Sequence, residues 1–592
     1  MQSLIPVTAF VRISWCQKLP FIIYYCTRES IFHHSAKSFP ENLWPSRKLL
    51  VFLHRTNKIM MIMAPTKRRR YPVGIQTFSR LIRDGYVYVD KTDLVWQMAN
   101  EDNPFLFLAR PRRFGKSLLA STLHSFFAGE RELFRGLKAD TLEWDWQQYP
   151  VLHFDLSPAK DLPTAEELRN RLMLILEPLA EIYGSTPKET TPGALFQGLI
   201  HRAYKQTNRQ VAIIIDEYDA PLLNWLHDDE LLKQKRNVMQ ELYAPLKACE
   251  PFIKCCFITG ITKFSQLSIF STINNLTNIS MLPKYSALCG ITEEELTTTL
   301  APDIALLAEA NECTPEEMHQ KLKERYDGYM FSEKAPEIYN PFSLFKAFST
   351  QKVGFYWFDS GTPTFLIRQM QKFRTDITSL NDMEVTSSAF DKPTEAMTTA
   401  LPLLYQSGYL TIKGYDREGE AYTLGIPNQE VQTGYADGLL PTYVGLEGSD
   451  VQMGFALKFW RALKKDDLDL ALREMQTYLA GLPYVEGFKK KLEEVAVAEG
   501  FYEWTFYLIF SMLNVYVRTQ VKCNGGRIDM VVYMPDTTYI FELKMHESAQ
   551  KALEQINVKG YALPYHTEGR RVVKVGLHFN LDSRTLDEWA ME

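Results

Sequence analysis

The segment Phe105–Ser117 constrains the fold of this chain more than any other, because a strand, a loop and a helix follow one another there. Its first five residues are an apolar run that predicts a buried strand, and residues 118–127 carry apolar side chains with helical spacing. The loop between them ends in Gly115-Lys116-Ser117. Because backbone N–H groups at the start of a helix attract anions, this order predicts a phosphate-binding loop.

Within this loop, Lys116 is predicted to reach the β- and γ-phosphates of ATP, and Ser117 to bind Mg²⁺. The consensus G-x-x-x-x-G-K-[ST] has glycine where this chain has Arg110. Since glycine permits a tight loop that a side chain resists, either the loop has a different conformation or nucleotide binding is weaker. A Gly-Lys-Ser tripeptide that merely starts a helix is the simpler alternative.

A second segment favours the nucleotide-site hypothesis over that alternative. Val211–Ile215 is a largely β-branched run, and Asp216 and Glu217 follow it about one hundred residues after the loop. A central parallel strand has this pattern when its carboxyl end presents charge to a ligand. Asp216 is predicted to hold Mg²⁺, directly or through water, and Glu217 to polarise the attacking water.

Two further strands are predicted in this part of the chain. Residues 253–263 form one, and Thr259 near its end is a candidate γ-phosphate sensor, although a Thr-Gly turn that closes the strand explains the same residues. Tyr86–Thr92 predicts a short strand that leads into a helix.

Composition limits the remaining possibilities. A chain of 592 residues is too long for one core, so two to four domains are expected. The eight cysteines include no C-x-x-C pair, which favours reduced thiols and a cytoplasmic protein. No run of about 18 apolar residues occurs, so we expect no membrane helix and no membrane partner.

The first seventy residues differ from the rest in charge. They carry twelve Lys and Arg against two Glu, a net +10, which leaves −15 for the remainder of the chain. They also lack sustained periodicity, and Met60, Met61 and Met63 directly precede a basic run. We therefore interpret residues 1–65 as a disordered or mis-annotated extension, with the natural start at one of these methionines.

A second candidate site lies near the C-terminus. Residues 525–533 and 539–545 predict a β-hairpin, in which alternation places Glu542 and Lys544 on one face and Asp529 beside them. Asp529, Glu542 and the Leu543 carbonyl oxygen would bind Mg²⁺ or Mn²⁺, while Lys544 would orient or help deprotonate water, as in a metal-dependent phosphodiesterase. Cross-strand Glu/Lys pairs are also common on surfaces, so this pattern alone is weak.

Several segments, in order, resemble a bacterial family of AAA-ATPase-like proteins with a C-terminal PD-(D/E)XK nuclease-like domain. They include Gly74–Phe78, Tyr88–Thr92 and Arg110–Ser117, and the likeness covers nearly everything from Tyr71 to the C-terminus. In that family the loop has the sequence Arg-Pro-Arg-Arg-Phe-Gly-Lys-Ser, so Arg110 is a family feature.

The resemblance also implies further site residues. Arg112, Arg113 and Phe114 belong to the family's loop and are expected beside the phosphates, although the sequence does not give the direction of the two arginines. Gln555 matches a helical glutamine that lies near the metal in the PD-(D/E)XK group. Glu503 is expected as a fourth member of that site, where the family usually has histidine after Tyr502.

The implied fold class is α/β, with a parallel central sheet in the P-loop domain, a helical and winged-helix-like middle region, and a C-terminal α/β nuclease-like domain. A hairpin-like pair of strands within residues 403–431, after helices, suggests the winged-helix-like part. The expected boundaries are 66–290 for the ATPase-like domain, 291–435 for the middle region, 436–498 for a helical connector and 499–592 for the nuclease-like domain.

Two hypotheses for function follow. The first is an ATP-binding and ATP-hydrolysing protein whose nucleotide state controls a metal-dependent nuclease-like domain. The second is a nucleotide-gated regulatory scaffold whose nuclease-like domain is catalytically inactive. Residues 500–592 have a net charge of −1, so DNA or RNA is expected to bind weakly or conditionally. The sequence is compatible with an oligomer but gives no interface.

Overall fold

The computed structural model divides the chain into two units, Met1–Arg69 and Arg70–Glu592. In the first unit, β1 (Phe52–Leu53) and β2 (Ile59–Met60) form a short antiparallel pair, and almost all of residues 1–65 lie outside the described part. The finer domain boundaries remain predictions. The structure describes residues 52–53, 59–60, 69–263, 276–357, 364–373, 375, 380–393, 397–444, 449–481, 495–512, 516–534, 536–566, 569–580, 583 and 585–592.

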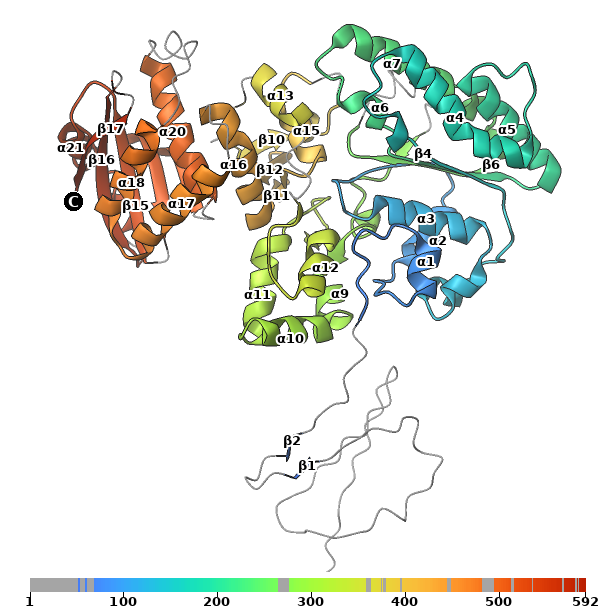
Figure 1. Ribbon diagram of the computed structural model, residues 1–592, viewed down its shortest axis with the longest axis horizontal. Helices are drawn as coiled ribbons and strands as arrows, with labels where there is room; N and C mark the ends of the chain where they lie inside the picture. Colours follow the sequence, from blue (N-terminus) through green and yellow to red (C-terminus); the bar gives the residue numbers. More distant parts are fainter. Residues whose placement is uncertain are drawn as a thin grey trace, which may run out of the picture. The chain divides into compact units, whose positions relative to one another are not determined.

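The N-terminal part of the larger unit contains a parallel five-stranded sheet with the order β4-β5-β6-β3-β7. Helices α1 to α3 lie on one side of this sheet and α4 to α7 on the other (Figure 1). The predicted parallel central sheet is confirmed. The elements are α1 (Phe78–Arg83), α2 (Thr92–Ala99), β3 (Phe105–Ala109), α3 (Lys116–Phe127), β4 (Val151–Asp155), α4 (Ala165–Tyr183), α5 (Pro192–Thr207), β5 (Val211–Asp216), α6 (Ala220–Leu223), α7 (Asp229–Tyr243), α8 (Pro245–Ala248), β6 (Ile253–Gly260) and β7 (Thr277–Asn278).

The strand order fixes where loops meet. β6 lies between β3, which precedes the glycine-lysine-serine loop, and β5, which is buried along its whole length and ends at Asp216. Ala109 at the end of β3 pairs with Gly260, and Ile215 near the end of β5 pairs with Ile258. Because the strands are parallel, the segments that follow β3, β5 and β6 emerge at the same edge of the sheet.

The short strand predicted at Tyr86–Thr92 is wrong. Tyr86 forms only an isolated bridge with Arg70, and the residues up to Lys91 are irregular. The carboxylate of Asp90 accepts hydrogen bonds from Thr92 N and Oγ1 and from Lys138 N. These bonds bend the chain toward the start of α2, so among the described residues Tyr86 is the only one of this segment that forms a β-bridge.

The middle region consists of helices followed by a small antiparallel sheet. A hairpin is present, formed by β11 and β12 with β10 paired to β12, but its first strand starts at Thr411 and not at Leu403 as predicted. Residues 401–406, in the segment predicted as that strand, are a helix. Pro402 occupies the first turn of that helix, where its missing N–H costs nothing. The elements are β8 (Ile291–Thr292), α9 (Glu293–Thr298), α10 (Ala301–Ala310), α11 (Pro315–Tyr326), β9 (Ile338–Tyr339), α12 (Pro341–Thr350), α13 (Thr364–Lys372), β10 (Met383–Thr386), α14 (Ser387–Phe390), α15 (Leu401–Gln406), β11 (Thr411–Asp416) and β12 (Ala421–Gly425).

The C-terminal part contains a second five-stranded sheet, with the order β13-β14-β15-β16-β17. Only β15 and β16 are parallel, and the other neighbours are antiparallel. Helix α18 packs against β17. The elements are α16 (Gln429–Val444), α17 (Ser449–Lys464), α18 (Leu468–Ala480), α20 (Val495–Met512), β13 (Tyr516–Cys523), β14 (Gly526–Tyr533), β15 (Thr537–Lys544), α21 (Ala549–Lys559), β16 (Arg571–Asn580) and β17 (Thr585–Met591). Among the described residues, no helix has both the length and the apolarity that crossing a bilayer requires.

Helices α20 and α21 cover opposite faces of this sheet. Phe541 of β15 contacts Phe506 of α20, whereas Ile540 belongs to the apolar cluster that contains Ile556 of α21. Even-numbered residues of β15 therefore face α21, and the predicted alternation that puts Glu542 and Lys544 on one face is confirmed.

Gly576 of β16 lies directly beside Glu542 and allows α21 to approach the sheet. A Cβ atom at this position would come within 2.2 Å of Ala549 O and 2.7 Å of Leu553 N. We expect Gly576→Ala to destabilise the protein by about 1–3 kcal/mol, because the helix backbone must move away. Gly414→Ala in β11, where the nearest atom would be 3.5 Å away, is the control. Thermal unfolding curves that shift equally for both variants would contradict this prediction.

Candidate functional site

The loop between β3 and α3 is shaped by two residues with left-handed backbone conformation, Arg113 (φ 63°) and Gly115 (φ 96°). Gly115 is the N-cap of α3, and no side chain caps that helix. Lys116 is only 4% exposed, and its Nζ donates to the carbonyl oxygens of Arg110 and Pro111 at 3.1 Å each. The loop thus combines an ammonium group with the positive end of a helix dipole, and both attract anions.

Ser117 lies next to the carboxylate at the end of β5. Its hydroxyl lies close enough to the carboxylate of Asp216 to lower the pKa of that group, and Asp216 is only 4% exposed. Burial raises the pKa of Asp216 to about 6; the Ser117 hydroxyl and Lys116 lower it, and Glu217 raises it further. A hydroxyl and a buried carboxylate in contact offer two oxygen ligands of the kind that Mg²⁺ binds.

Glu217 follows Asp216 in a left-handed conformation (φ 52°), which costs a residue with a side chain about 1–3 kcal/mol. The next residues hold this turn in place. Tyr218 N donates to Thr259 O, and the Tyr218 hydroxyl donates to Thr262 O. The buried carboxylate of Asp219 accepts from Ile261 N and from Thr262 N and Oγ1.

Asp219 is a residue whose role the sequence analysis missed. It ties the end of β5 to the segment that follows β6, and burial raises its pKa to about 6. The available signal was a third acidic residue, three positions after Asp216 and directly before the apolar run Ala220–Leu223.

Thr259 occupies the centre of the sheet. Its hydroxyl donates to Leu108 O of the neighbouring strand at 2.8 Å, and the residue is fully buried. In this arrangement the side chain links β6 to β3, and its role as a phosphate sensor stays a prediction.

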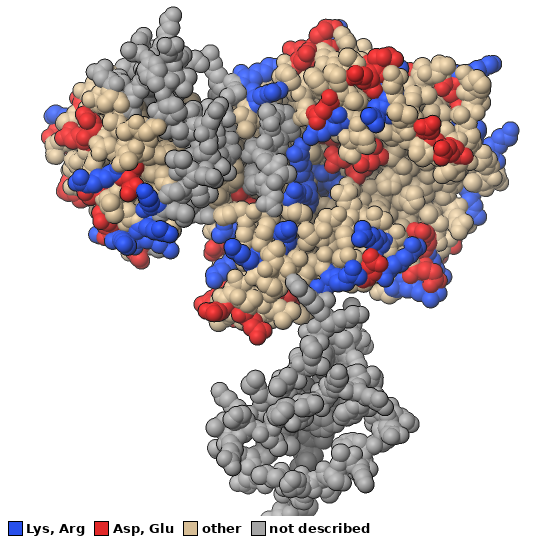
Figure 2. All heavy atoms as spheres, viewed as in Figure 1, with Lys and Arg blue, Asp and Glu red and all other residues tan. Residues whose placement is uncertain are grey.

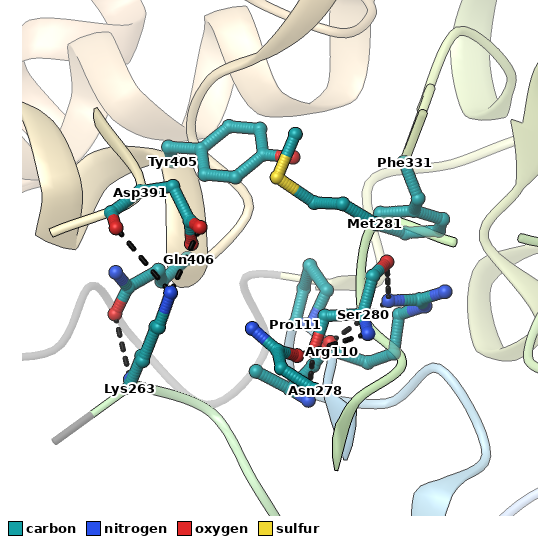
Figure 3. A pocket seen from close by; sticks show the side chains of 11 residues that line it. Arg110, Pro111, Lys263, Asn278, Ser280, Met281, Phe331, Asp391, Tyr405 and Gln406 are labelled. Carbon is teal, nitrogen blue, oxygen red and sulfur yellow. Dashed lines mark hydrogen bonds and ion pairs between the residues drawn. The ribbon is translucent and has the colours of Figure 1, made fainter. Parts of the chain in front are cut away.

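Arg110, which replaces the first consensus glycine, is directed away from the loop's interior. The residue is 1% exposed, and its guanidinium donates to Ala109 O at 3.0 Å, Ser280 O at 2.7 Å and Tyr285 O at 3.1 Å. It also stacks over the ring of Phe331 at 4.1 Å. Figure 3 shows the bond to Ser280 beside the hollow that Arg110 lines. Of the two alternatives for Arg110, a different loop conformation therefore describes this position. The arginine anchors the segment after β7, and burial lowers the pKa of its guanidinium to about 10.

The loop's next side chains contact the middle region. Arg113 Nη1 donates to Tyr356 O at 3.1 Å, and its guanidinium lies 4.0 Å from the Phe342 ring centroid. Phe114 is buried and packs edge-on against Tyr329 at 4.7 Å. The structure thus brings Gly115, Lys116, Ser117 and Asp216 together, but it turns Arg113 and Phe114 outward.

Arg112 is placed by its backbone. Its carbonyl oxygen accepts a hydrogen bond from Trp357 Nε1 at 3.2 Å. The predicted contact of Arg112 with phosphate stays a prediction, whereas a phosphate contact of Arg113 would require the guanidinium to leave Tyr356 and Phe342.

A small hollow of about 80 Å³ adjoins Gly115. Leu118 and Leu119 of the first turn of α3 line it, together with Ile291 and Phe345 of the middle region. Its walls are predominantly apolar, and the ammonium of Lys91, which also lines it, is paired with Glu295 at 2.7 Å. Apolar walls of this kind favour a flat, apolar-faced group.

In the C-terminal sheet, the two predicted acids face each other across β14 and β15. Asp529 Oδ2 accepts a hydrogen bond from Leu543 N at 2.8 Å. Glu542 is 2% exposed, and burial together with the Asp529 charge raises its pKa to about 8. Its Oε2 atom is buried without a hydrogen-bond partner. A cation between the two carboxylates would satisfy this atom, so the residues fit a divalent metal.

Two of the predicted companions contact Glu542 directly. Lys544 Nζ lies 3.5 Å from Glu542 Oε1, and Gln555 of α21 donates to the same oxygen. The side chain of Glu503 lies outside the described residues. Within the described part, no group of three or more His, Cys, Asp or Glu residues is arranged to hold a metal ion.

Comparisons with known proteins match the two parts of the chain that carry these candidate sites. The model of a family described as predicted AAA-ATPase matches residues 72–270, and the PD-(D/E)XK nuclease superfamily model matches residues 497–589. A protein of Azotobacter chroococcum mcd 1, described as "Uncharacterized protein in vnfD 5'region", is 33% identical over 538 residues, which cover 89% of this chain and 99% of the relative. The chain belongs to this AAA-ATPase-like family. The first match of this AAA-ATPase-like protein contains Lys116 and Asp216, and the second contains Asp529 and Glu542.

The buried contacts of Arg110 in this AAA-ATPase-like protein lead to a prediction about the consensus glycine. We expect Arg110→Gly to lower stability by about 2–4 kcal/mol, because the carbonyl oxygens of Ser280 and Tyr285 lose a charged donor and a cavity forms under Phe331. Thermal unfolding monitored by circular dichroism measures the loss.

Two variants control this experiment. Arg110→Ala separates loss of the side chain from the extra flexibility of glycine, and Arg83→Ala removes an exposed arginine from α1. A more stable Arg110→Gly variant would show that the arginine is a strained replacement and not an anchor.

Proposed function

We propose that this AAA-ATPase-like protein binds and hydrolyses ATP and thereby controls a metal-dependent nuclease-like domain that acts on nucleic acid. The observation that carries the proposal is the contact of Ser117 with the buried carboxylate of Asp216, directly beside Lys116. Two strands far apart in sequence converge there, and a helix start that merely resembles a phosphate loop would have no carboxylate partner.

For ATP hydrolysis, each residue of this site receives a role. The backbone N–H groups around Gly115 and the ammonium of Lys116 would hold the phosphates. Ser117 and Asp216 would hold Mg²⁺, which supplies charge neutralisation at the phosphates when bound. Glu217 would orient and polarise the attacking water, and Thr259 is the candidate sensor.

The apolar hollow beside Gly115 would receive the nucleobase. The hollow adjoins Gly115, directly before the phosphate-binding helix. A nucleotide whose phosphates lie at Lys116 would therefore have its base next to the hollow. Apolar walls contributed by Leu118 and Phe345 favour stacking of an aromatic base.

At the C-terminal site, Asp529, Glu542 and the Leu543 carbonyl oxygen would hold Mg²⁺ or Mn²⁺, which supplies Lewis-acid chemistry at phosphorus. Lys544 would orient the attacking water and help remove its proton. Gln555 would fix the Glu542 carboxylate, with Glu503 as a fourth member. The buried, unpartnered oxygen of Glu542 supports this assignment.

Nucleic acid would bind weakly or only in one nucleotide state. Acidic and basic side chains both occur over the C-terminal part on the face drawn in Figure 2, in agreement with the net charge of −1 for residues 500–592. A tight, constitutive duplex clamp needs an excess of basic groups.

The regulatory scaffold remains the second candidate function, because one observation favours it. Two carboxylates alone, without a third described acid or histidine, form a sparse metal site. In that case the domain would bind a partner and cleave nothing.

We expect Lys116→Ala to weaken ATP binding by about 30-fold or more, because the charge that neutralises the phosphates is removed from a buried position. Isothermal titration calorimetry with ATP and Mg²⁺ measures the change. Lys205→Ala, an exposed lysine of α5, is the control. Equal ATP affinity of the Lys116 variant and the wild type would rule out this loop as the nucleotide site.

We expect Asp529→Asn to reduce Mn²⁺-dependent cleavage of plasmid or single-stranded DNA by about 100-fold or more, because a metal-binding charge is lost, and to leave ATP hydrolysis intact. Asp536→Asn, an exposed acid in the turn before β15, is the control. No cleavage by the wild type with several metals and with ATP present would favour the scaffold.

A further inference from the structure

Residues Gly354–Trp357 of the middle region hold the outer side of the phosphate-binding loop. Tyr356 O accepts from Arg113 Nη1 at 3.1 Å, and Trp357 Nε1 donates to Arg112 O at 3.2 Å. Tyr356 and Trp357 therefore contact two consecutive residues of the loop, Arg113 and Arg112. Arg113 is one of the two loop residues with left-handed backbone conformation, so these contacts lie where the loop is most strained.

The buried carboxylate of Glu430 binds the backbone of this segment. Glu430 Oε1 accepts from Tyr356 N at 2.6 Å and from Trp357 N at 3.0 Å, and Glu430 Oε2 accepts from the Ser343 hydroxyl at 2.7 Å. Glu430 is 1% exposed. The same two residues that contact the loop are thus fixed through their backbone N–H groups by a single side chain.

The other groups around Glu430 complete its environment. The Arg325 guanidinium attracts its charge. Burial raises the pKa values of the Tyr326 and Tyr329 phenol groups, and the nearby Glu430 charge raises them further. Burial, the largest cause, raises the pKa of Glu430 to about 7, and its bonds to Ser343, Tyr356 and Trp357 oppose that rise.

Glu430 also belongs to an element that leads toward the second site. It lies in the first turn of α16, and α16 packs against α20. Helix α20 in turn covers one face of the sheet that carries Asp529 and Glu542. The carboxylate therefore lies between the phosphate-binding loop and a helix that packs on the sheet face opposite Glu542.

We propose that Glu430 is a positioning residue for nucleotide binding: by fixing residues 356 and 357, it fixes the backbone carbonyl of Arg112 and the side chain of Arg113, and so the shape of the loop around Lys116. This inference rests on the proposed ATP binding. It adds a residue more than three hundred positions away from the loop to the nucleotide site.

The test compares two substitutions at this position by calorimetric titration with ATP and Mg²⁺ on the full chain. Glu430→Ala removes the acceptor and is expected to weaken ATP binding by about three- to thirty-fold. Glu430→Gln keeps an oxygen that can accept from Tyr356 N and Trp357 N, and is expected to stay within about two-fold of the wild type.

Two neighbouring variants show whether the effect passes through residues 356 and 357. Trp357→Phe removes the Nε1 donor to Arg112 O and keeps an aromatic ring at this position. It should weaken ATP binding less in a Glu430→Ala background than in the wild type, because both changes act on one connection. Ser343→Ala removes the contact to Oε2 and should leave ATP affinity unchanged.

A pH series distinguishes positioning from general stabilisation. Ionised Glu430 is the stronger acceptor, so the ratio of ATP affinities between wild type and Glu430→Gln should fall as pH drops through about 7. Stability should change with the opposite sign. Because the pKa is raised in the fold, the contribution of Glu430 to stability is complete below pH 4.5 and is lost as pH rises through 7, so the Gln variant should be the more stable above that pH.

The outcomes separate this inference from the proposed function. A folded Glu430→Ala variant that binds ATP like the wild type, or a Glu430→Gln variant that fails as badly as Glu430→Ala, would overturn the positioning role alone. A wild type that binds no ATP would overturn the nucleotide site itself.

Discussion

The approach of the Ser117 hydroxyl to the Asp216 carboxylate joins the two segments on which the N-terminal site depends. It is possible because β3 and β5 run parallel with β6 between them, so that their carboxyl ends reach one edge of the sheet. The same arrangement brings the ammonium of Lys116 near this buried acid, and the balance of burial and charge leaves the pKa of Asp216 at about 6. A bound cation would stabilise its ionised form.

The loop that carries Lys116 is held from outside as much as from within. Arg110 is buried among backbone carbonyl oxygens, Arg113 bonds to Tyr356, and Phe114 packs against Tyr329. Side chains that would be expected around phosphates instead attach the loop to the rest of the domain. This arrangement explains how a chain without the first consensus glycine still forms a loop that encloses a lysine: the left-handed conformations lie at Arg113 and Gly115, and Arg110 needs none.

The C-terminal site has a different physical basis. Glu542 is buried on the face that α21 covers, next to Asp529, and its pKa of about 8 expresses the cost of burying a second negative charge there. Gln555 and Lys544 reduce that cost at one oxygen only. Gly576 makes the arrangement possible, since without a Cβ atom it lets α21 bring Gln555 to the carboxylate.

Much of the fold and of both sites could be predicted from local pattern. The strands at Phe105–Ala109 and Val211–Asp216 are apolar runs of strand length. The faces of the β14–β15 hairpin follow from alternation, because successive side chains of a strand point to opposite faces of the sheet. The proximity of Lys116 and Ser117 to Asp216 follows from the order strand, loop, helix and acidic strand. Tyr86–Thr92 could not be predicted in this way, since Asp90 binds Thr92 at the start of α2 and, among the described residues, the segment pairs only through the single bridge of Tyr86 with Arg70.

The amino-acid sequence by itself determined which helices and strands form and which residue types stand at their ends, because these features depend on residues close together in the chain. Only the tertiary structure decided where Arg110, Arg113 and Asp219 point and that Glu430 supports the loop from more than three hundred residues away. Each of these side chains forms hydrogen bonds with backbone groups distant in sequence. Burial determines such contacts, because a charged group removed from water needs polar partners, and only the folded chain places them beside it.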